Sequence, residues 1–71
     1  EKRFALKKGA YIKFGARIGA NSILLPRVVV GREAFVAAGS VVTKDVPDGK
    51  LVMGVPAKIV RDVPSEEFVQ I

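Results

Sequence analysis

A branched aliphatic residue recurs at every sixth position between Leu6 and Val42 of this 71-residue chain. Seven such residues in register are rare by chance, so the period is a strong structural signal. A period of six excludes an amphipathic helix, whose apolar positions recur every 3.6 residues. It is typical of a short strand and a tight corner that repeat along the chain. The recurring residues are Leu6, Ile12, Ile18, Leu24, Val30, Val36 and Val42.

Three consecutive repeats would close one triangular coil, with one strand on each side. Each aliphatic side chain would then point inward and stack on its equivalent three repeats further along the chain. The fourth residue after each aliphatic is small or short, as a tight corner requires. The predicted stacks are Leu6/Leu24/Val42, Ile12/Val30 and Ile18/Val36, and the predicted corner residues are Ala10, Ala16, Ser22, Val28, Ala34, Ser40 and Val46.

The residue just before each small corner residue is expected to need a positive φ, which favours glycine and asparagine. Arg27 and Glu33 occupy this place in two corners and suit it poorly. We therefore expect the Pro26–Arg27 corner to be the least regular one. The better-suited residues in the same place are Gly9, Gly15, Asn21 and Gly39.

The repeat stops at Val46, where Pro47, Asp48 and Gly49 have the composition of a turn. We therefore divide the chain into β-helix coils over residues 1–46 and an exit loop, strand and C-terminal tail over residues 47–71. The tail is expected to lie across the open end of the coil or against a neighbouring chain. The elements expected in this part are a strand at 51–53, an extended piece at 58–61 and a helical turn with Ser65 as its N-cap.

The repeat, together with the segment GSVVTKDVPDGKLVMGVPAKIVRDVP at 39–64, resembles the hexapeptide-repeat acyltransferase family. The resemblance extends from Leu6 to about Arg61, and its most specific part is a TK-D-P run followed by G-x-P-A-K/R-x-x-R. It implies an all-β fold, the left-handed parallel β-helix, in the C-terminal part of a sugar or small-molecule acetyltransferase. It also implies a homotrimer and acetyl-coenzyme A (acetyl-CoA) as the co-substrate.

The resemblance further implies which residues contact the co-substrate. Small outward residues at the corners would leave a smooth groove for the pantetheine arm, and cations at one end would meet the phosphates. The residues that match the family's contact positions are Ala20, Ala38, Thr43, Lys44, Lys58 and Arg61. The alternative interpretation is corner packing for the two alanines and a solvated surface for the charged residues.

The sequence contains no histidine, whereas the family's transferases generally use one to deprotonate the acceptor hydroxyl or amine. We therefore assign no catalytic residue and expect the chain to be the C-terminal section of a longer acyltransferase. A non-catalytic trimeric scaffold and the β-helix tail of a bifunctional sugar-nucleotide nucleotidyltransferase remain as alternatives. The γ-class carbonic anhydrases share the fold but need three histidines on zinc, so the sequence excludes that activity and any metal of that kind.

Composition and the outward positions narrow the partners. One face carries mainly apolar outward residues, which marks it as the expected trimer contact, or alternatively as a contact with the chain's own tail. Aromatic residues are too sparse for nucleic-acid binding, although the net charge is +5. No apolar run is long enough to span a membrane, and the absence of cysteine favours a cytoplasmic location. The apolar outward residues are Ala5, Ile23, Leu25 and Val41.

Overall fold

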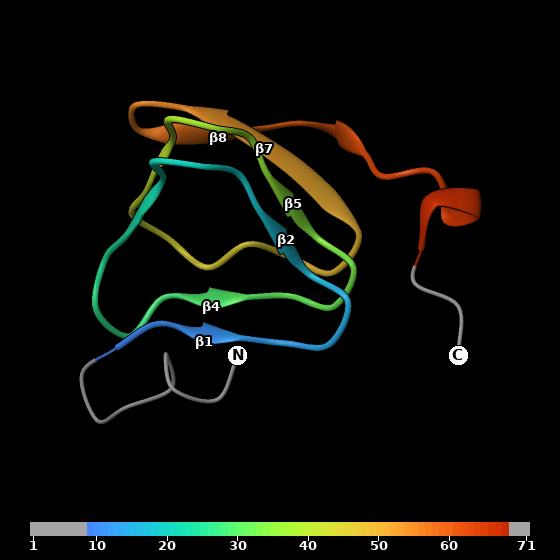
Figure 1. The fold of residues 1–71 in the computed structure, drawn as a ribbon, viewed down its shortest axis with the longest axis horizontal. Helices are drawn as coiled ribbons and strands as arrows, with labels where there is room; N and C mark the ends of the chain where they lie inside the picture. The colour runs from blue at the N-terminus through green and yellow to red at the C-terminus, as the bar shows by residue number, and fades with distance from the viewer. Residues whose placement is uncertain (1–8, 69–71) are drawn as a thin grey trace.

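The computed structural model describes residues 9–68, which wind into a triangular coil with a sheet on each side (Figure 1). Each of the first three strands pairs in parallel with the strand one coil later, and the sheets are β1–β4, β2–β5–β7–β8 and β3–β6. The strands are β1 (Tyr11–Ile12), β2 (Arg17–Ile18), β3 (Ile23–Leu24), β4 (Val29–Val30), β5 (Phe35–Val36), β6 (Val41–Val42), β7 (Lys50–Gly54) and β8 (Ala57–Asp62).

The predicted aliphatic stacks are confirmed within the described residues. Ile12 pairs with Val30, Ile18 with Val36, and Leu24 with Val42. Leu6, the first member of its stack, lies outside the described residues. The valines of the second coil form the centre of the core, because β-branched side chains pack well on short strands. Val30 and Val36 have no exposed surface, and Val42 is 1% exposed.

The corner at Pro26–Arg27 is as regular as the others, so the prediction of an irregular corner was wrong. The Val28 N–H donates to the Leu25 carbonyl over 3.2 Å, the same distance as in the first described corner. A positive φ at the third turn residue is the type II pattern, in which proline is favoured at the second place. The residues with this φ are Gly15 (79°), Asn21 (60°), Arg27 (69°), Glu33 (60°) and Gly39 (75°).

The third coil, which begins at Val42, is shorter than the regular spacing of the strands before it, because Val36 pairs with Val52, where an unbroken repeat would bring Gly54 beside it. The shortening falls between Val42 and Val46. Val46 therefore bridges to Val30 and is buried in the core, which corrects its predicted place as a corner residue.

Two aspartates hold the shortened coil to the coil below it. Asp45 Oδ1 accepts the Val29 N–H over 2.9 Å, and Asp48 Oδ1 accepts the Arg32 N–H over 2.8 Å. Each backbone N–H group in a folded chain needs an acceptor. The two carboxylates accept N–H groups that would otherwise donate to backbone carbonyls of the next coil.

The coil ends in a hairpin. β7 pairs in parallel with β5 and antiparallel with β8, with an irregularity in register between Leu51 and Val52. The chain reverses between Gly54 and Ala57 through a cis Val55–Pro56 peptide. The predicted strand at 51–53 and the predicted extended piece at 58–61 are therefore confirmed.

The tail leaves the coil beside Gly49, whose carbonyl accepts the Val63 N–H over 2.7 Å. It ends in a single 3-10 turn, η2 (Ser65–Glu67), and Figure 1 shows this segment beside the triangle and not across it. Pro64 is the N-cap and no side chain caps the turn, so the prediction of Ser65 as N-cap was wrong. Over the described part of the chain, no helix is long and apolar enough to cross a membrane.

Candidate functional site

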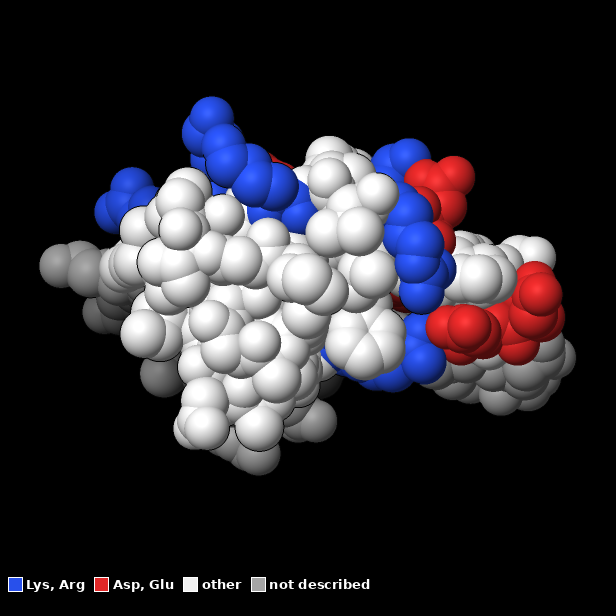
Figure 2. Space-filling model, turned by 90° about the horizontal axis from the view of Figure 1, so that it is seen from above, with Lys and Arg blue, Asp and Glu red and all other residues white. Residues whose placement is uncertain are grey.

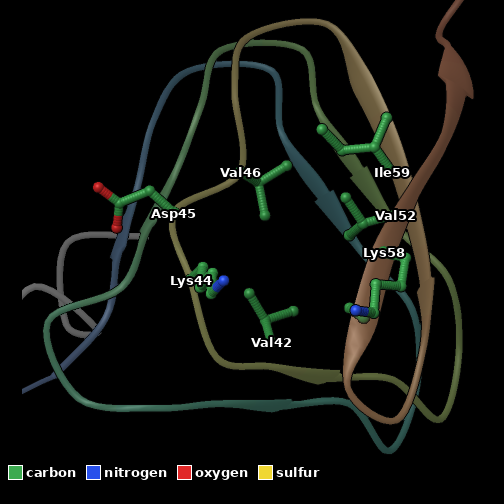
Figure 3. A pocket seen from close by; sticks show the side chains of 8 residues that line it. Val42, Lys44, Asp45, Val46, Val52, Lys58 and Ile59 are labelled. Atoms are coloured by element: carbon green, nitrogen blue, oxygen red, sulfur yellow. The ribbon is translucent and has the colours of Figure 1, made fainter.

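A cavity of about 210 Å³ lies at the open end of the third coil. Figure 3 shows the side chains of Val42, Val46 and Val52 directed into it, with Lys44 and Lys58 on opposite sides. The apolar floor is the last layer of the coil's own core. The complete lining is Val42, Lys44, Asp45, Val46, Val52, Ala57, Lys58 and Ile59.

The two lysines reach this cavity from different elements. Lys44 follows β6 in the shortened corner, and Lys58 lies on β8, paired with Met53 of β7. Both side chains are exposed. The acid in the lining, Asp45, is turned away from the cavity (Figure 3) and accepts the Val29 N–H. The rim is therefore a place where an anion can meet two ammonium groups.

The corner that carries Ala20 and Ala38 is closely stacked. The Gly39 N–H donates to the Ala20 carbonyl over 3.0 Å, and both alanines are exposed. A Cβ at Gly19 would lie 2.4 Å from the Ala38 nitrogen and 2.7 Å from its Cα, so only glycine permits this approach. The result is a flank of small side chains, as predicted from the sequence.

The remaining predicted residues are placed differently. Thr43 is exposed and immediately precedes Lys44, but it does not line the cavity. Arg61 pairs with Leu51 at the far end of β8, and its Nη1 donates to the Asp62 carbonyl over 2.8 Å. The structure therefore brings Lys44 and Lys58 to one cavity and directs Arg61 elsewhere.

Two serines at this corner form contacts that sequence reasoning assigned only to packing. Ser22 Oγ donates to the Ala37 carbonyl over 3.0 Å, and Ser40 Oγ accepts the Gly54 N–H over 3.1 Å. The sequence did carry a signal for these contacts. Two corners one full coil apart have a serine hydroxyl at the place where the neighbouring corners have alanine or valine.

The predicted contact face is partly exposed. Ile23 is 56% and Leu25 38% exposed, and Val41 is half-buried beside Ile23. Ala5 lies outside the described residues.

Figure 2 shows a broad uncharged surface bordered by lysine and arginine side chains, with acidic side chains gathered at one side, where the tail lies. Further large exposed apolar residues come from the hairpin and were not predicted: Met53, Val55, Ile59 and Val60.

The six-residue repeat and the triangular coil define the class of hexapeptide-repeat β-helix proteins. The model of the bacterial transferase hexapeptide (six repeats) matches residues 9–44, which is half of the chain. The chain belongs to this family. Its fold is that of the left-handed β-helix acetyltransferases.

Three relatives are similar over most of the chain. The bifunctional protein GlmU of Rubrobacter xylanophilus is 47% identical over 60 residues, which is 84% of this chain. A 2,3,4,5-tetrahydropyridine-2,6-dicarboxylate N-acetyltransferase of Staphylococcus aureus is 54% identical over 44 residues, or 62% of this chain. The crystal structure of serine acetyltransferase in complex with coenzyme A from Brucella abortus matches with a TM-score of 0.78 at 40% identity over 80% of this chain.

The chain corresponds to a small part of each relative. It spans 13% of the GlmU protein, 18% of the N-acetyltransferase and 23% of the serine acetyltransferase chain. The two relatives that are named as acetyltransferases share acetyl transfer as their reaction, although their acceptors differ.

Proposed function

We propose that this chain forms the CoA-binding coils of an acetyltransferase that modifies a hydroxyl or amine of a sugar or similar small molecule. The observation that carries the proposal is that Lys44 and Lys58 line the same cavity. The serine acetyltransferase structure in complex with coenzyme A, at 40% identity, supports the choice of ligand.

In this arrangement the pantetheine arm lies along the flank formed by Ala20 and Ala38, with Thr43 close to its course. Small side chains there give the arm's amides access to backbone groups. The phosphates lie at Lys44 and Lys58, where charge-assisted hydrogen bonds are strongest. Arg61 joins them only if its side chain leaves the Asp62 carbonyl.

The transfer step needs a group that removes a proton from the acceptor as its oxygen or nitrogen attacks the thioester carbonyl. The CoA thiolate then leaves and takes up a proton. The sequence has no histidine for this role. We propose that the base and the acceptor contacts come from other parts of a longer enzyme, which the short coverage of the relatives supports.

We also propose a homotrimer through the face of Ala5, Ile23, Leu25 and Val41. The 56% exposure of Ile23 supports it, because large apolar side chains are unfavourable in water. A cytoplasmic location stays a prediction.

The β-helix part of a bifunctional sugar-nucleotide enzyme is a second candidate. The observation that favours it is the 47% identity to the bifunctional protein GlmU over 60 residues. A nucleotidyltransferase domain encoded upstream would support this candidate, and a histidine one or two coils upstream without such a domain would support a dedicated acetyltransferase.

Calorimetry with CoA tests the proposed function. The Lys44→Ala/Lys58→Ala double variant should bind CoA about 10- to 100-fold more weakly, because each lost charged hydrogen bond is worth about 1–3 kcal/mol before solvent screening. Lys13→Ala is the matched control, since Lys13 is also exposed but does not line the cavity. Equal binding by the double variant and the parent, or no binding by the parent, would contradict the proposal.

A further inference from the structure

We infer that Ser40 is a positioning residue whose buried hydroxyl anchors the β7–β8 hairpin and thereby sets the position of Lys58. The functional half of this inference rests on the proposed function, because it takes Lys58 as a phosphate contact. Ser40 itself touches no ligand, since it is 1% exposed and does not line the cavity.

The anchor is a single hydrogen bond at the start of the hairpin turn. The Gly54 N–H donates to Ser40 Oγ over 3.1 Å. The last backbone bond from the coil to β7 is formed one step earlier, where the Ala37 N–H donates to the Val52 carbonyl over 3.0 Å. Beyond Val52, the bond to Ser40 is the hydrogen bond that links the coil to the hairpin turn within the described residues, and Ala57 packs against the core.

The corner one coil lower is held by a backbone hydrogen bond instead. There the chain continues into the next coil, and the Gly39 N–H donates to the Ala20 carbonyl. At the hairpin the chain reverses, Pro56 has no N–H to donate, and Gly54 has a φ of 108°. The Gly54 N–H is held by a serine hydroxyl and not by a backbone carbonyl.

Lys58 lies close to this anchor along the hairpin. Gly54 pairs with Ala57, and Met53 pairs with Lys58, so the lysine is the second strand residue after the turn. A shift of Gly54 is therefore transmitted directly to Lys58. An exposed lysine loses considerable rotamer entropy when it binds an anion. A backbone that is already fixed lowers the total entropy cost of binding, because only the side chain must be ordered.

Ser22 provides the matched control. It occupies the equivalent place in the coil before, and its hydroxyl donates to the Ala37 carbonyl over 3.0 Å. Ser22→Ala thus removes a corner hydrogen bond of similar length without touching the hairpin. Ser40→Ala leaves the Gly54 N–H without its acceptor.

Hydrogen exchange of the backbone amides measures the anchoring without any ligand. Ser40→Ala should speed exchange at the amides of 53–59 about tenfold or more, with β1 and β4 unchanged, because the hairpin opens locally. Ser22→Ala should leave the hairpin amides at their parental rates. Unchanged hairpin exchange in Ser40→Ala would overturn the inference. If that variant does not fold, Ser40→Cys keeps the side-chain size with a weaker acceptor and takes its place.

CoA titrations at several salt concentrations measure the consequence for Lys58. Ser40→Ala should weaken CoA binding about three- to tenfold and flatten its salt dependence, as Lys58→Ala should, because a phosphate contact is lost. In the Lys58→Ala background, Ser40→Ala should have no further effect, whereas Ser22→Ala should preserve the salt dependence in both backgrounds.

Fully additive effects of Ser40→Ala and Lys58→Ala would reject the positioning role. Failure of the parent to bind CoA would refute the proposed function instead, and the exchange rates would still decide whether Ser40 anchors the hairpin.

Discussion

Replacement of Gly19 by alanine should destabilise the coil through backbone contact alone. A Cβ at this position would lie 2.4 Å from the Ala38 nitrogen, 2.7 Å from the Ala38 Cα and 2.9 Å from the Ala37 carbonyl carbon. These are main-chain atoms of the next coil, so no side-chain rotation relieves the overlap. Overpacking of this kind typically costs about 1–3 kcal/mol, and we expect Gly19→Ala to reach the upper end or exceed it.

Gly39 separates this steric effect from backbone strain. It has a φ of 75°, but a Cβ there would meet nothing within 4 Å. Gly39→Ala should therefore cost about 1–2 kcal/mol from the left-handed conformation alone. Gly39→Asn should cost less, because asparagine tolerates this region and Asn21 already adopts a φ of 60°.

Urea unfolding followed by circular dichroism at one protein concentration gives the free energies of unfolding for all three variants. The expected order of destabilisation is Gly19→Ala, then Gly39→Ala, then Gly39→Asn. A Gly19→Ala variant within about 0.5 kcal/mol of the parent would show that the coils separate easily, and the steric reasoning would be refuted.

Three further predictions concern assembly, coil closure and chemistry. Ile23→Asp/Leu25→Asp should sediment as monomers or aggregates, because charge is introduced into the proposed contact face, and an intact trimer would show that the face is wrongly assigned. Asp48→Ala should lower the unfolding free energy by about 1–3 kcal/mol, since the Arg32 N–H loses its acceptor, while Asp48→Asn should cost less; equal losses would argue against the hydrogen bond. Acetyl transfer by this chain should stay near background in a thiol-release assay, because no side chain in the sequence has an unperturbed pKa between about 5 and 8. Rapid turnover would mean that a carboxylate such as Asp45, or the acceptor itself, handles the proton.

The strands and stacks could be predicted because the period alone sets the register. Once Ile12, Ile18 and Leu24 point inward, the residues three repeats later must lie above them. Local preference failed at Arg27 and Glu33, where the stacking of neighbouring coils imposes a positive φ on residues that seldom adopt it.

The shortened coil and the Ser40 bond could not be predicted for a different reason. Val46 continues the six-residue count, and only the strand pairing, Val46 with Val30 and Val52 with Val36, reveals that the coil is shortened. The meeting of Ser40 with Gly54 depends on where the chain reverses, which the repeat does not encode. Lys44 and Lys58 were singled out by resemblance, and the cavity between them required the fold.

The shortened third coil determines where the β-helix could be lengthened by a further coil. The full-length coils before Thr43 share one register, so a duplicated coil such as 19–36 would find matching neighbours above and below. The same insertion after Val46 would lie next to a coil whose strands are in a different register. Lengthening is therefore compatible with the fold only at the amino-terminal side, and the cavity with Lys44 and Lys58 would stay at the far end of a coil of any length.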